Sequence, residues 1–325
     1  MNTDRSSRWL EFLQSHGFAI KDNSAEISIN RGSARTAAEW TPLLENQIIS
    51  VAGKDAESFL NSLLSCDVTQ LKMNSALQTG LCNAKGRLIA APFLTKDTEA
   101  YRLILPKDIS AECVKTLQKY KLRSKVDIKL ARNFVIVGIL HNHESELKQT
   151  WIEDQLINHE PTRLGATINK RRSFIYGDAQ HIIELLEKSQ DLRPISNQEW
   201  VLNEIRDYQA QISKPLQELF IPQAIHLERN DGISFTKGCY PGQEIVARTK
   251  YLGTIKRQLY KFSREQPSIA GEFITNIDGQ NVGVVVSNAK DETDGYVGLA
   301  VMIREQIKEL PIVFSDFKIF DQLEK

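Results

Sequence analysis

This 325-residue chain lacks most of the features that assign a function directly. It has only four cysteines, no C-x-x-C pair and no clustered histidines, so zinc-finger and ferredoxin-type metal sites have no support. No stretch approaches the ~18 apolar residues that span a bilayer, and the N-terminus lacks the apolar core of a signal peptide. We therefore expect an unexported, cytoplasmic protein with reduced thiols, no resident metal and no membrane partner.

Common nucleotide and hydrolase motifs are also absent. No G-x-G-x-x-G follows a predicted strand, and the sequence contains no G-x-x-x-x-G-K-[ST], H-E-x-x-H or G-x-S-x-G. The net charge is zero, with 41 basic and 41 acidic residues, so there is no overall attraction to nucleic acid. The function must therefore be inferred from local patterns.

Three local patterns each allow two interpretations. Residues 115–132 hold seven basic side chains against one acid, which could contact RNA but is more typical of a solvated face. His141-Asn142-His143 could bind a metal, although its polar, turn-like context favours a loop. Sequence spacing cannot exclude a cluster assembled in space from three of the cysteines, namely Cys66, Cys82 and Cys239.

Periodicity predicts an α+β protein with an arm at residues 1–42, an α+β region at 43–249, and an antiparallel β barrel at 250–325. Helices are expected at 6–16, 55–64, 106–120, 144–156, 178–189 and from 196. Strands are expected at 47–52, 100–105, 126–130, 134–140 and 173–176, and a hairpin at 76–95 with its turn at 84–86. The barrel strands are expected at 253–262, 271–277, 281–287, 296–302 and 312–319.

One motif stands out at the predicted junction before the barrel: residues 237–248, KGCYPGQEIVAR. Cys239 lies between Gly238 and Gly242, Pro241 can open a helix, and Glu244 falls in its first turn. The positive end of that helix, with Lys237 and Arg248, favours the thiolate form of Cys239. The alternative is a cysteine that only packs. Residues 237–264 contain seven basic side chains and one acid, which suits an extended anionic ligand.

Trp200 follows a capping box, Ser196-Asn197-Gln198-Glu199, and so lies near the start of a helix. A tryptophan in that position usually belongs to the core. If it does not, it offers a flat surface on which a heteroaromatic ring can stack.

The sequence from Lys237 to Glu244 resembles the K-G-C-Y-x-G-Q-E signature of the YgfZ family, folate-dependent proteins related to the glycine-cleavage aminomethyltransferases. Three further segments support the resemblance: 220–223 (FIPQ), 232–235 (GISF) and 83–87 (NAKGR), the last similar to a D-A-K-G-[KR] hairpin turn. The resemblance spans residues 43–325. It implies the glycine-cleavage T-protein fold, three subdomains in a ring around a folate pocket. Two of these subdomains are intertwined in the folate-binding region 43–249, and the third is the antiparallel β barrel.

For the site, the resemblance implies that Cys239 is the essential thiol and that its signature partners are Lys237, Gly238, Tyr240, Gly242, Gln243 and Glu244. It implies tetrahydrofolate or a related folate as cofactor, in contact with Trp200. A second family tryptophan falls by spacing on Asn46, six residues after Trp40, and Asn83 replaces the usual aspartate of the hairpin turn.

For function, the resemblance implies a folate-binding protein that supports iron-sulfur cluster assembly or repair, and thereby tRNA thiolation, rather than a conventional turnover enzyme. The implied partners are iron-sulfur enzymes or cluster-assembly proteins, without direct tRNA contact. Two alternatives stay open: a folate-dependent aminomethyl or one-carbon transferase, and an RNA-binding factor.

Overall fold

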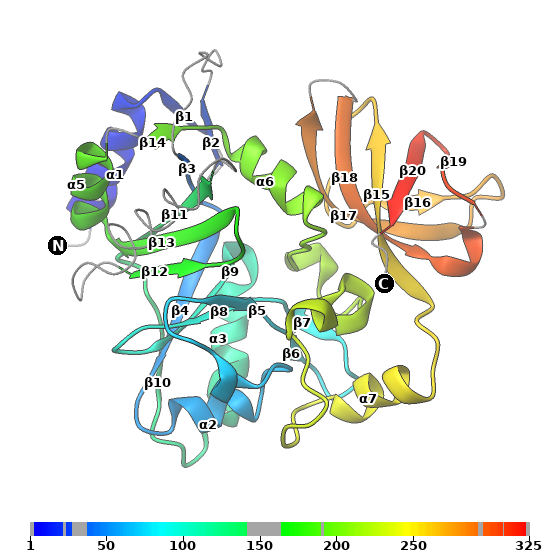
Figure 1. The fold of residues 1–325 in the computed structure, drawn as a ribbon, viewed down its shortest axis with the longest axis horizontal. Helices are drawn as coiled ribbons and strands as arrows, with labels where there is room; N and C mark the ends of the chain where they lie inside the picture. Colours follow the sequence, from blue (N-terminus) through cyan, green and yellow to red (C-terminus); the bar gives the residue numbers. More distant parts are fainter. Residues whose placement is uncertain are drawn as a thin grey trace. The chain divides into compact units, whose positions relative to one another are not determined.

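A computed structural model of the chain describes residues 3–21, 24–27, 38–141, 164–189, 192–291, 295–307 and 309–322. The chain forms two compact units (Figure 1). Unit 1 comprises residues 1–56, 71–77 and 93–200, and unit 2 comprises residues 57–70, 78–92 and 201–325. The predicted boundaries after residues 42 and 249 do not appear in this two-way division and stay a prediction.

The first sheet of unit 1 has the strand order β10-β4-β9-β8-β5, with β4 and β9 paired antiparallel. Helix α3 packs against β4 and β9 and begins directly after Pro106, whose fixed φ suits a helix start. These elements are β4 (Asn46–Ala52), β5 (Ala76–Gln78), β8 (Phe93–Lys96), β9 (Tyr101–Pro106), α3 (Lys107–Lys121) and β10 (Asp127–Leu130).

The second sheet of unit 1 has the order β12-β13-β11-β3-β14, antiparallel except for the parallel pair β14 and β3. Its apolar strand β11 lies in the middle, as its composition predicts, because a central strand is buried on both faces. Helix α5 packs against β13, and α1 packs against α5. The elements are α1 (Thr3–Ser15), the hairpin β1 (Phe18–Lys21) and β2 (Ser24–Ile27), β3 (Ala38–Pro42), β11 (Phe134–His141), β12 (Leu164–Thr167), β13 (Arg172–Asp178), α5 (Ala179–Lys188) and β14 (Leu192–Pro194).

Two apolar clusters of described residues contribute to the core of unit 1. One joins α1 and α5 to β3, β11 and β13 through side chains such as Trp9, Trp40 and Ile182. The other contains side chains from both sheets, including Ile48, Phe174 and Trp200. Trp200 belongs to α6 (Asn197–Arg206), where Ser196 accepts a hydrogen bond from the Gln198 N–H, as the capping box predicts.

Unit 2 ends in a curled antiparallel sheet of order β16-β17-β18-β15-β20-β19, a half-barrel (Figure 1). The curl brings the edge strands β16 and β19 toward each other. Ser315, in the β19-β20 turn, donates a hydrogen bond to the Thr275 carbonyl of β16. The predicted strand 312–319 is two strands, because Ser315 has a φ of +52° and turns the chain. The elements are β15 (Arg257–Arg264), β16 (Phe273–Thr275), β17 (Asn281–Asp291), β18 (Gly295–Ile303), the 3₁₀ turn η6 (Arg304–Gln306), β19 (Ile312–Phe314) and β20 (Phe317–Gln322).

The described residues in the rest of unit 2 form most of helix α2, a short hairpin, the C-terminal part of α6, a long irregular stretch and helix α7. The hairpin is smaller than predicted, because the chain breaks between β5 and β6 and again between β7 and β8. The irregular residues 207–242 are ordered by three 3₁₀ turns and by apolar side chains packed into one cluster. The elements are α2 (Ala56–Asn61), which spans the unit boundary, η1 (Val68–Gln70), β6 (Leu81–Cys82), β7 (Leu88–Ala90), η3 (Lys214–Leu216), η4 (Pro222–Ile225), η5 (Leu227–Asn230) and α7 (Gln243–Tyr251).

Most predicted elements are confirmed within a few residues, although α2 is shorter than the predicted 55–64. The helix predicted at 144–156 and the last two residues of His141-Asn142-His143 lie outside the described residues. His141 ends β11, where its Nε2 lies 2.8 Å from the Ser173 hydroxyl and burial lowers the pKa of its ring to about 4. Across the part of the chain that the structure describes, no helix is both long and apolar enough to cross a membrane.

Candidate functional site

The motif loop, residues 237–242, connects the irregular stretch of unit 2 to helix α7. The helix begins at Gln243, two residues later than predicted, because Gly242 has a φ of +80° and therefore forms its N-cap. Pro241 lies outside the helix, which corrects its predicted place as the first helical residue. Glu244 falls in the first turn, as predicted, where its carboxylate complements the positive end of the helix.

Gly242 is the point at which two of the sequence motifs meet. A Cβ at this position would lie 2.5 Å from the Asn83 carbonyl oxygen and 2.5 Å from the Gly86 Cα, both in the β6-β7 turn. Asn83 itself organises that turn, since its Oδ1 accepts hydrogen bonds from the N–H groups of Lys85 at 2.9 Å and Arg87 at 3.0 Å. An aspartate oxygen would accept the same two bonds, so asparagine preserves the turn without the charge.

A third motif holds α7 from another direction. The Gln223 side chain donates a 2.7 Å hydrogen bond to the Val246 carbonyl in α7, and Gln223 is 1% exposed. The Phe220 carbonyl accepts a 2.8 Å hydrogen bond from the Leu88 N–H of β7. Segments near residues 85, 221 and 243 therefore form one hydrogen-bonded support, in which Gln223 has a role that the sequence alone did not suggest.

Gly242→Ala should destabilise the protein strongly, because alanine is strained at this φ and its Cβ would meet backbone atoms that cannot rotate away. We expect the free energy of unfolding to fall by at least about 2 kcal/mol. Gly238→Ala is the matched control, since no atom lies within 4 Å of its added Cβ, and its effect should stay within about 0.5 kcal/mol. Equal effects of the two variants in urea unfolding would contradict this account.

Lys237 anchors the other end of the motif loop. Its ammonium donates hydrogen bonds to the carbonyl oxygens of Asn61 and Leu64, both at 2.5 Å, and lies 5.0 Å from the centre of the Tyr240 ring. Carbonyl oxygens at a helix C-terminus attract a cation, so Lys237 stabilises the end of α2. Its predicted contribution was positive charge beside the thiol, but its ammonium is engaged by these carbonyls. No pattern in the sequence indicates those partners.

Burial lowers the pKa of Lys237 from 10.5 to about 8, against the opposing influence of Cys66 and Asp67. Between those two pKa values the unfolded chain binds the proton and the folded chain does not, so stability rises with pH in that window. Lys237→Met has no titratable group at this position. We therefore expect the free energy of unfolding of wild type to rise relative to that of Lys237→Met between pH 8 and pH 10.5. Urea unfolding at a series of pH values measures this difference. A difference that does not change with pH would show that Lys237 has the pKa of an ordinary lysine.

The Tyr240 ring points into unit 2 and fixes the middle of the motif loop. Tyr240 is 5% exposed, and the pKa of its hydroxyl is raised by burial, then by the neighbouring thiols of Cys82 and Cys66. Burial also raises the pKa of both thiols, that of Cys82 to about 12. The two cysteines are therefore neutral packing groups under ordinary conditions.

Cys239 differs from the other three cysteines because its side chain is exposed and theirs are buried. Among the residues that the structure describes, no group of three or more His, Cys, Asp or Glu side chains could hold a metal ion. Cys66, Cys82 and Cys239 thus do not form the cluster that spacing left open. What the loop offers chemically is one accessible thiol between two fixed anchors, Lys237 and Gly242.

The remaining signature residues are close to Cys239 in the sequence, and they leave its side chain exposed. Gly238 and Glu244 are exposed, Gln243 is half-buried, and its N–H donates to the Tyr240 carbonyl at 3.1 Å. Arg248 is exposed in the last turn of α7, a full helix length from Gly242. Its charge therefore favours the C-terminal end of α7. Their roles in function stay a prediction.

Trp200 lies in unit 1 and is 2% exposed. Its ring packs so tightly on Gly138 that a Cβ there would lie 2.5 Å from the Trp200 Cε3. The Arg172 guanidinium lies 5.3 Å from the ring centre, and the Phe174 ring 5.7 Å away. Trp40 is equally buried, and Asn46 lies at the start of β4. In this structure the two tryptophan side chains present almost no surface to a ligand. Folate contact through Trp200 stays a prediction.

Comparison with curated proteins identifies a family, and comparison with solved structures identifies a fold. A scan against models of protein families finds no match. A tRNA-modifying protein YgfZ of Aliivibrio fischeri (strain MJ11) is 32% identical over 271 residues, covering 78% of this chain and 82% of the relative. The YgfZ protein of a second strain, ES114, is 29% identical over 290 residues, covering 85% and 88%. The glycine cleavage system aminomethyltransferase T of Bartonella henselae matches with a TM-score of 0.71 at 15% identity, covering 96% and 95%.

Proposed function

Because this chain belongs to the family of tRNA-modifying proteins named YgfZ, we propose that it supports tRNA modification through the thiol of Cys239. The observation that carries the proposal is the exposure of Cys239 on a loop anchored at both ends. A nucleophile needs access, and it needs a support that holds it in place. The motif loop provides both.

The finer proposal is that the chain assists assembly or repair of iron-sulfur clusters in the enzymes that thiolate tRNA. The Cys239 thiolate would act on a cluster sulfur, a one-carbon adduct or a disulfide of a partner protein. Support comes from the chemistry of the loop, since a thiolate is the form of cysteine that displaces a thiolate from a disulfide, attacks an electrophilic carbon or binds the iron of a cluster. Lys237 and Tyr240 fix the loop, and Glu244 lies in the adjoining helical turn.

Tetrahydrofolate or a related folate is the cofactor that the family resemblance suggests, and it would supply or accept a one-carbon unit. The residues present do not fit the expected stacking, because the Trp200 ring is covered by Gly138 and neighboured by Arg172. The proposal that this chain binds folate therefore rests only on the family resemblance and the T-protein fold.

The proposal is tested in a strain that lacks its own copy of this gene. Wild-type chain should restore thiolated nucleosides in tRNA, measured by mass spectrometry of digested tRNA, together with the activity of a cluster-dependent enzyme. If the thiolated nucleosides return but the cluster-dependent enzyme stays inactive, the role in tRNA modification is supported and the role in cluster assembly or repair is contradicted. Restoration of neither would remove the proposed function.

A second candidate is a folate-dependent aminomethyl transferase, favoured by the T-protein fold over 96% of the chain. Its test is incubation of the pure protein with tetrahydrofolate and an aminomethyl donor. Formation of methylene-tetrahydrofolate would establish transferase activity. If no methylene-tetrahydrofolate forms while a known aminomethyltransferase is active in the same assay, this candidate function is excluded.

Direct RNA binding through residues 115–132 has less support. These basic residues are spread over the second half of α3, the following turn, β10 and the turn after β10, and Lys129 pairs with Asp127 at 3.2 Å. Unretarded tRNA at low salt would exclude this contact, because phosphate binding is strongest there.

A further inference from the structure

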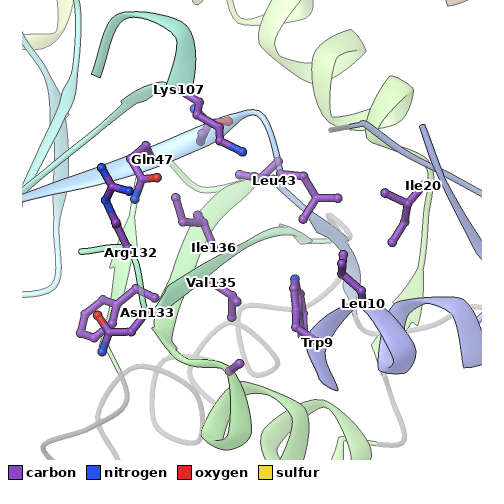
Figure 2. A pocket seen from close by; sticks show the side chains of 14 residues that line it. Trp9, Leu10, Ile20, Leu43, Gln47, Lys107, Arg132, Asn133, Val135 and Ile136 are labelled. Carbon is purple, nitrogen blue, oxygen red and sulfur yellow. The ribbon is translucent and has the colours of Figure 1, made fainter. Parts of the chain in front are cut away.

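A cavity of about 530 Å³ in unit 1 is separate in its residues from the Cys239 motif and from Trp200 (Figure 2). Fourteen of the described residues line it, contributed by α1, β1, the turn before β4, the start of β4, the start of α3, the turn before β11, β11 itself and the first residue of α5. Its volume lies within the range of pockets that hold small organic molecules, roughly 300–1,000 Å³.

The floor and the rim of this cavity differ in chemistry. Nine of the fourteen side chains are apolar, and they include Leu43, Val135 and Ile136. Among the described residues that line the cavity, two are cations, Lys107 and Arg132, and none is acidic. Figure 2 shows the Lys107 and Arg132 side chains on the same side of the cavity, away from Trp9 and Ile20. An apolar floor with a cationic rim fits a molecule that has an apolar body and an anionic end.

Trp9 provides an independent indication of a ligand. It is 3% exposed, and its Nε1 has no hydrogen-bond partner among the described residues. In Figure 2 the indole nitrogen points away from α1, toward Leu43 and the space of the cavity. A buried N–H without an acceptor costs about 1–3 kcal/mol, so such a group is normally satisfied by protein, water or ligand. An acceptor atom on a molecule in the cavity would satisfy it.

Arg132 is the second group that lacks a partner. It is exposed in the turn before β11, which is closed by a 3.2 Å hydrogen bond from the Phe134 N–H to the Ala131 carbonyl. Within the described residues no hydrogen bond or ion pair engages its guanidinium. A planar guanidinium binds a carboxylate through two parallel hydrogen bonds.

From these observations we propose that the cavity between α1 and the β10-β11 turn binds an amphipathic organic anion, with its carboxylate at Arg132 and its apolar body on Leu43, Val135 and Ile136. The Trp9 N–H donates to a polar atom in the middle of that molecule. Charge complementarity selects this class over a neutral hydrophobe, which leaves the Arg132 guanidinium without a partner, and over an inorganic anion, which leaves the apolar floor uncovered.

Dansylglycine is a suitable probe because it carries a carboxylate, a sulfonyl acceptor and an aromatic body. Dansylamide is its uncharged counterpart, with the same aromatic body and sulfonyl group. We expect the full chain to bind dansylglycine in a 1:1 ratio with enhanced fluorescence. Arg132→Ala should weaken dansylglycine about tenfold and dansylamide less than about twofold, because only the former has the charge.

Two further variants make the test specific. Arg123→Ala removes an exposed arginine outside the cavity and should leave both affinities within about twofold of wild type. Trp9→Phe keeps the aromatic packing and removes the N–H, so it should weaken both probes about threefold to tenfold. The thermal midpoint of each variant checks that the protein is folded.

The proposal is overturned if dansylamide binds as tightly as dansylglycine, or if Arg132→Ala and Arg123→Ala have equal effects. It is also overturned if neither probe binds or if Trp9→Phe changes neither affinity. The experiment uses no folate and no tRNA, so its outcome is independent of the role proposed for Cys239.

Discussion

Replacing Cys239 with alanine is expected to reduce thiolated nucleosides in tRNA to the level of a strain that lacks the chain. The free energy of unfolding should stay within about 0.5 kcal/mol of wild type, because the side chain is exposed. Loss of function without loss of stability distinguishes a chemical role from a packing role. Mass spectrometry of tRNA and urea unfolding of the pure variant measure the two quantities.

Cys239→Ser and Thr236→Ala are the matched controls. Serine retains the size and polarity of the side chain but not the reactivity of a thiolate, so Cys239→Ser should fail as alanine does. Thr236 is also exposed in this segment, and its replacement should leave function intact. Full complementation by Cys239→Ala would remove the proposed role of the thiol.

The accessibility of the thiol can be measured on the same proteins. A thiol reagent such as Ellman's reagent should modify one cysteine in the native chain and four in denaturant, since three of the four are buried. Cys239→Ala should abolish the native reaction. Rapid modification of a second native cysteine would contradict the burial of Cys66, Cys82 and Cys113.

Trp200→Ala should have the largest effect on stability. Truncating a buried tryptophan costs about 3–5 kcal/mol through lost transfer energy and the cavity that remains. Here the ring also covers Gly138 and lies beside Arg172, which is 0% exposed. A buried guanidinium that loses its aromatic neighbour adds to the penalty. We expect a loss at the upper end of that range.

Far-UV circular dichroism is the appropriate signal for this experiment, because the substitution removes a fluorophore. Tyr251→Ala is the control, an aromatic truncation at a side chain that is 68% exposed, with an expected effect within about 0.5 kcal/mol. A loss below about 1 kcal/mol for Trp200→Ala, together with weaker folate binding, would show that the ring is a ligand surface rather than core.

Elements with a strong local pattern were predictable from sequence. Helix α3 follows Pro106, β11 is an uninterrupted apolar run, and the Ser196 cap precedes α6, so each position is set by neighbours in sequence. The elements that were misjudged depend on single backbone angles. Ser315 divides the last predicted strand, and Gly242 delays α7 by two residues, because a positive φ is invisible to periodicity.

The candidate site was predictable as a motif but not as an arrangement. The residue types around Cys239 indicated a reactive loop, and the resemblance named its family. The sequence did not indicate that Lys237 binds the carbonyls of Asn61 and Leu64, which lie more than 170 positions away in the chain. Backbone carbonyls carry no sequence signal, so contacts of this kind appear only when the chain is folded.

By itself the sequence determined the family, the order of the main elements and the identity of the functional cysteine candidate. Tertiary structure decided which side chains are accessible: Cys239 is exposed, Trp200 is buried, and residues as distant as Trp9 and Ala179 line one cavity. The physical reason is that residue type sets what a side chain can do. Whether solvent or a ligand reaches it depends on packing between segments that are far apart in the chain.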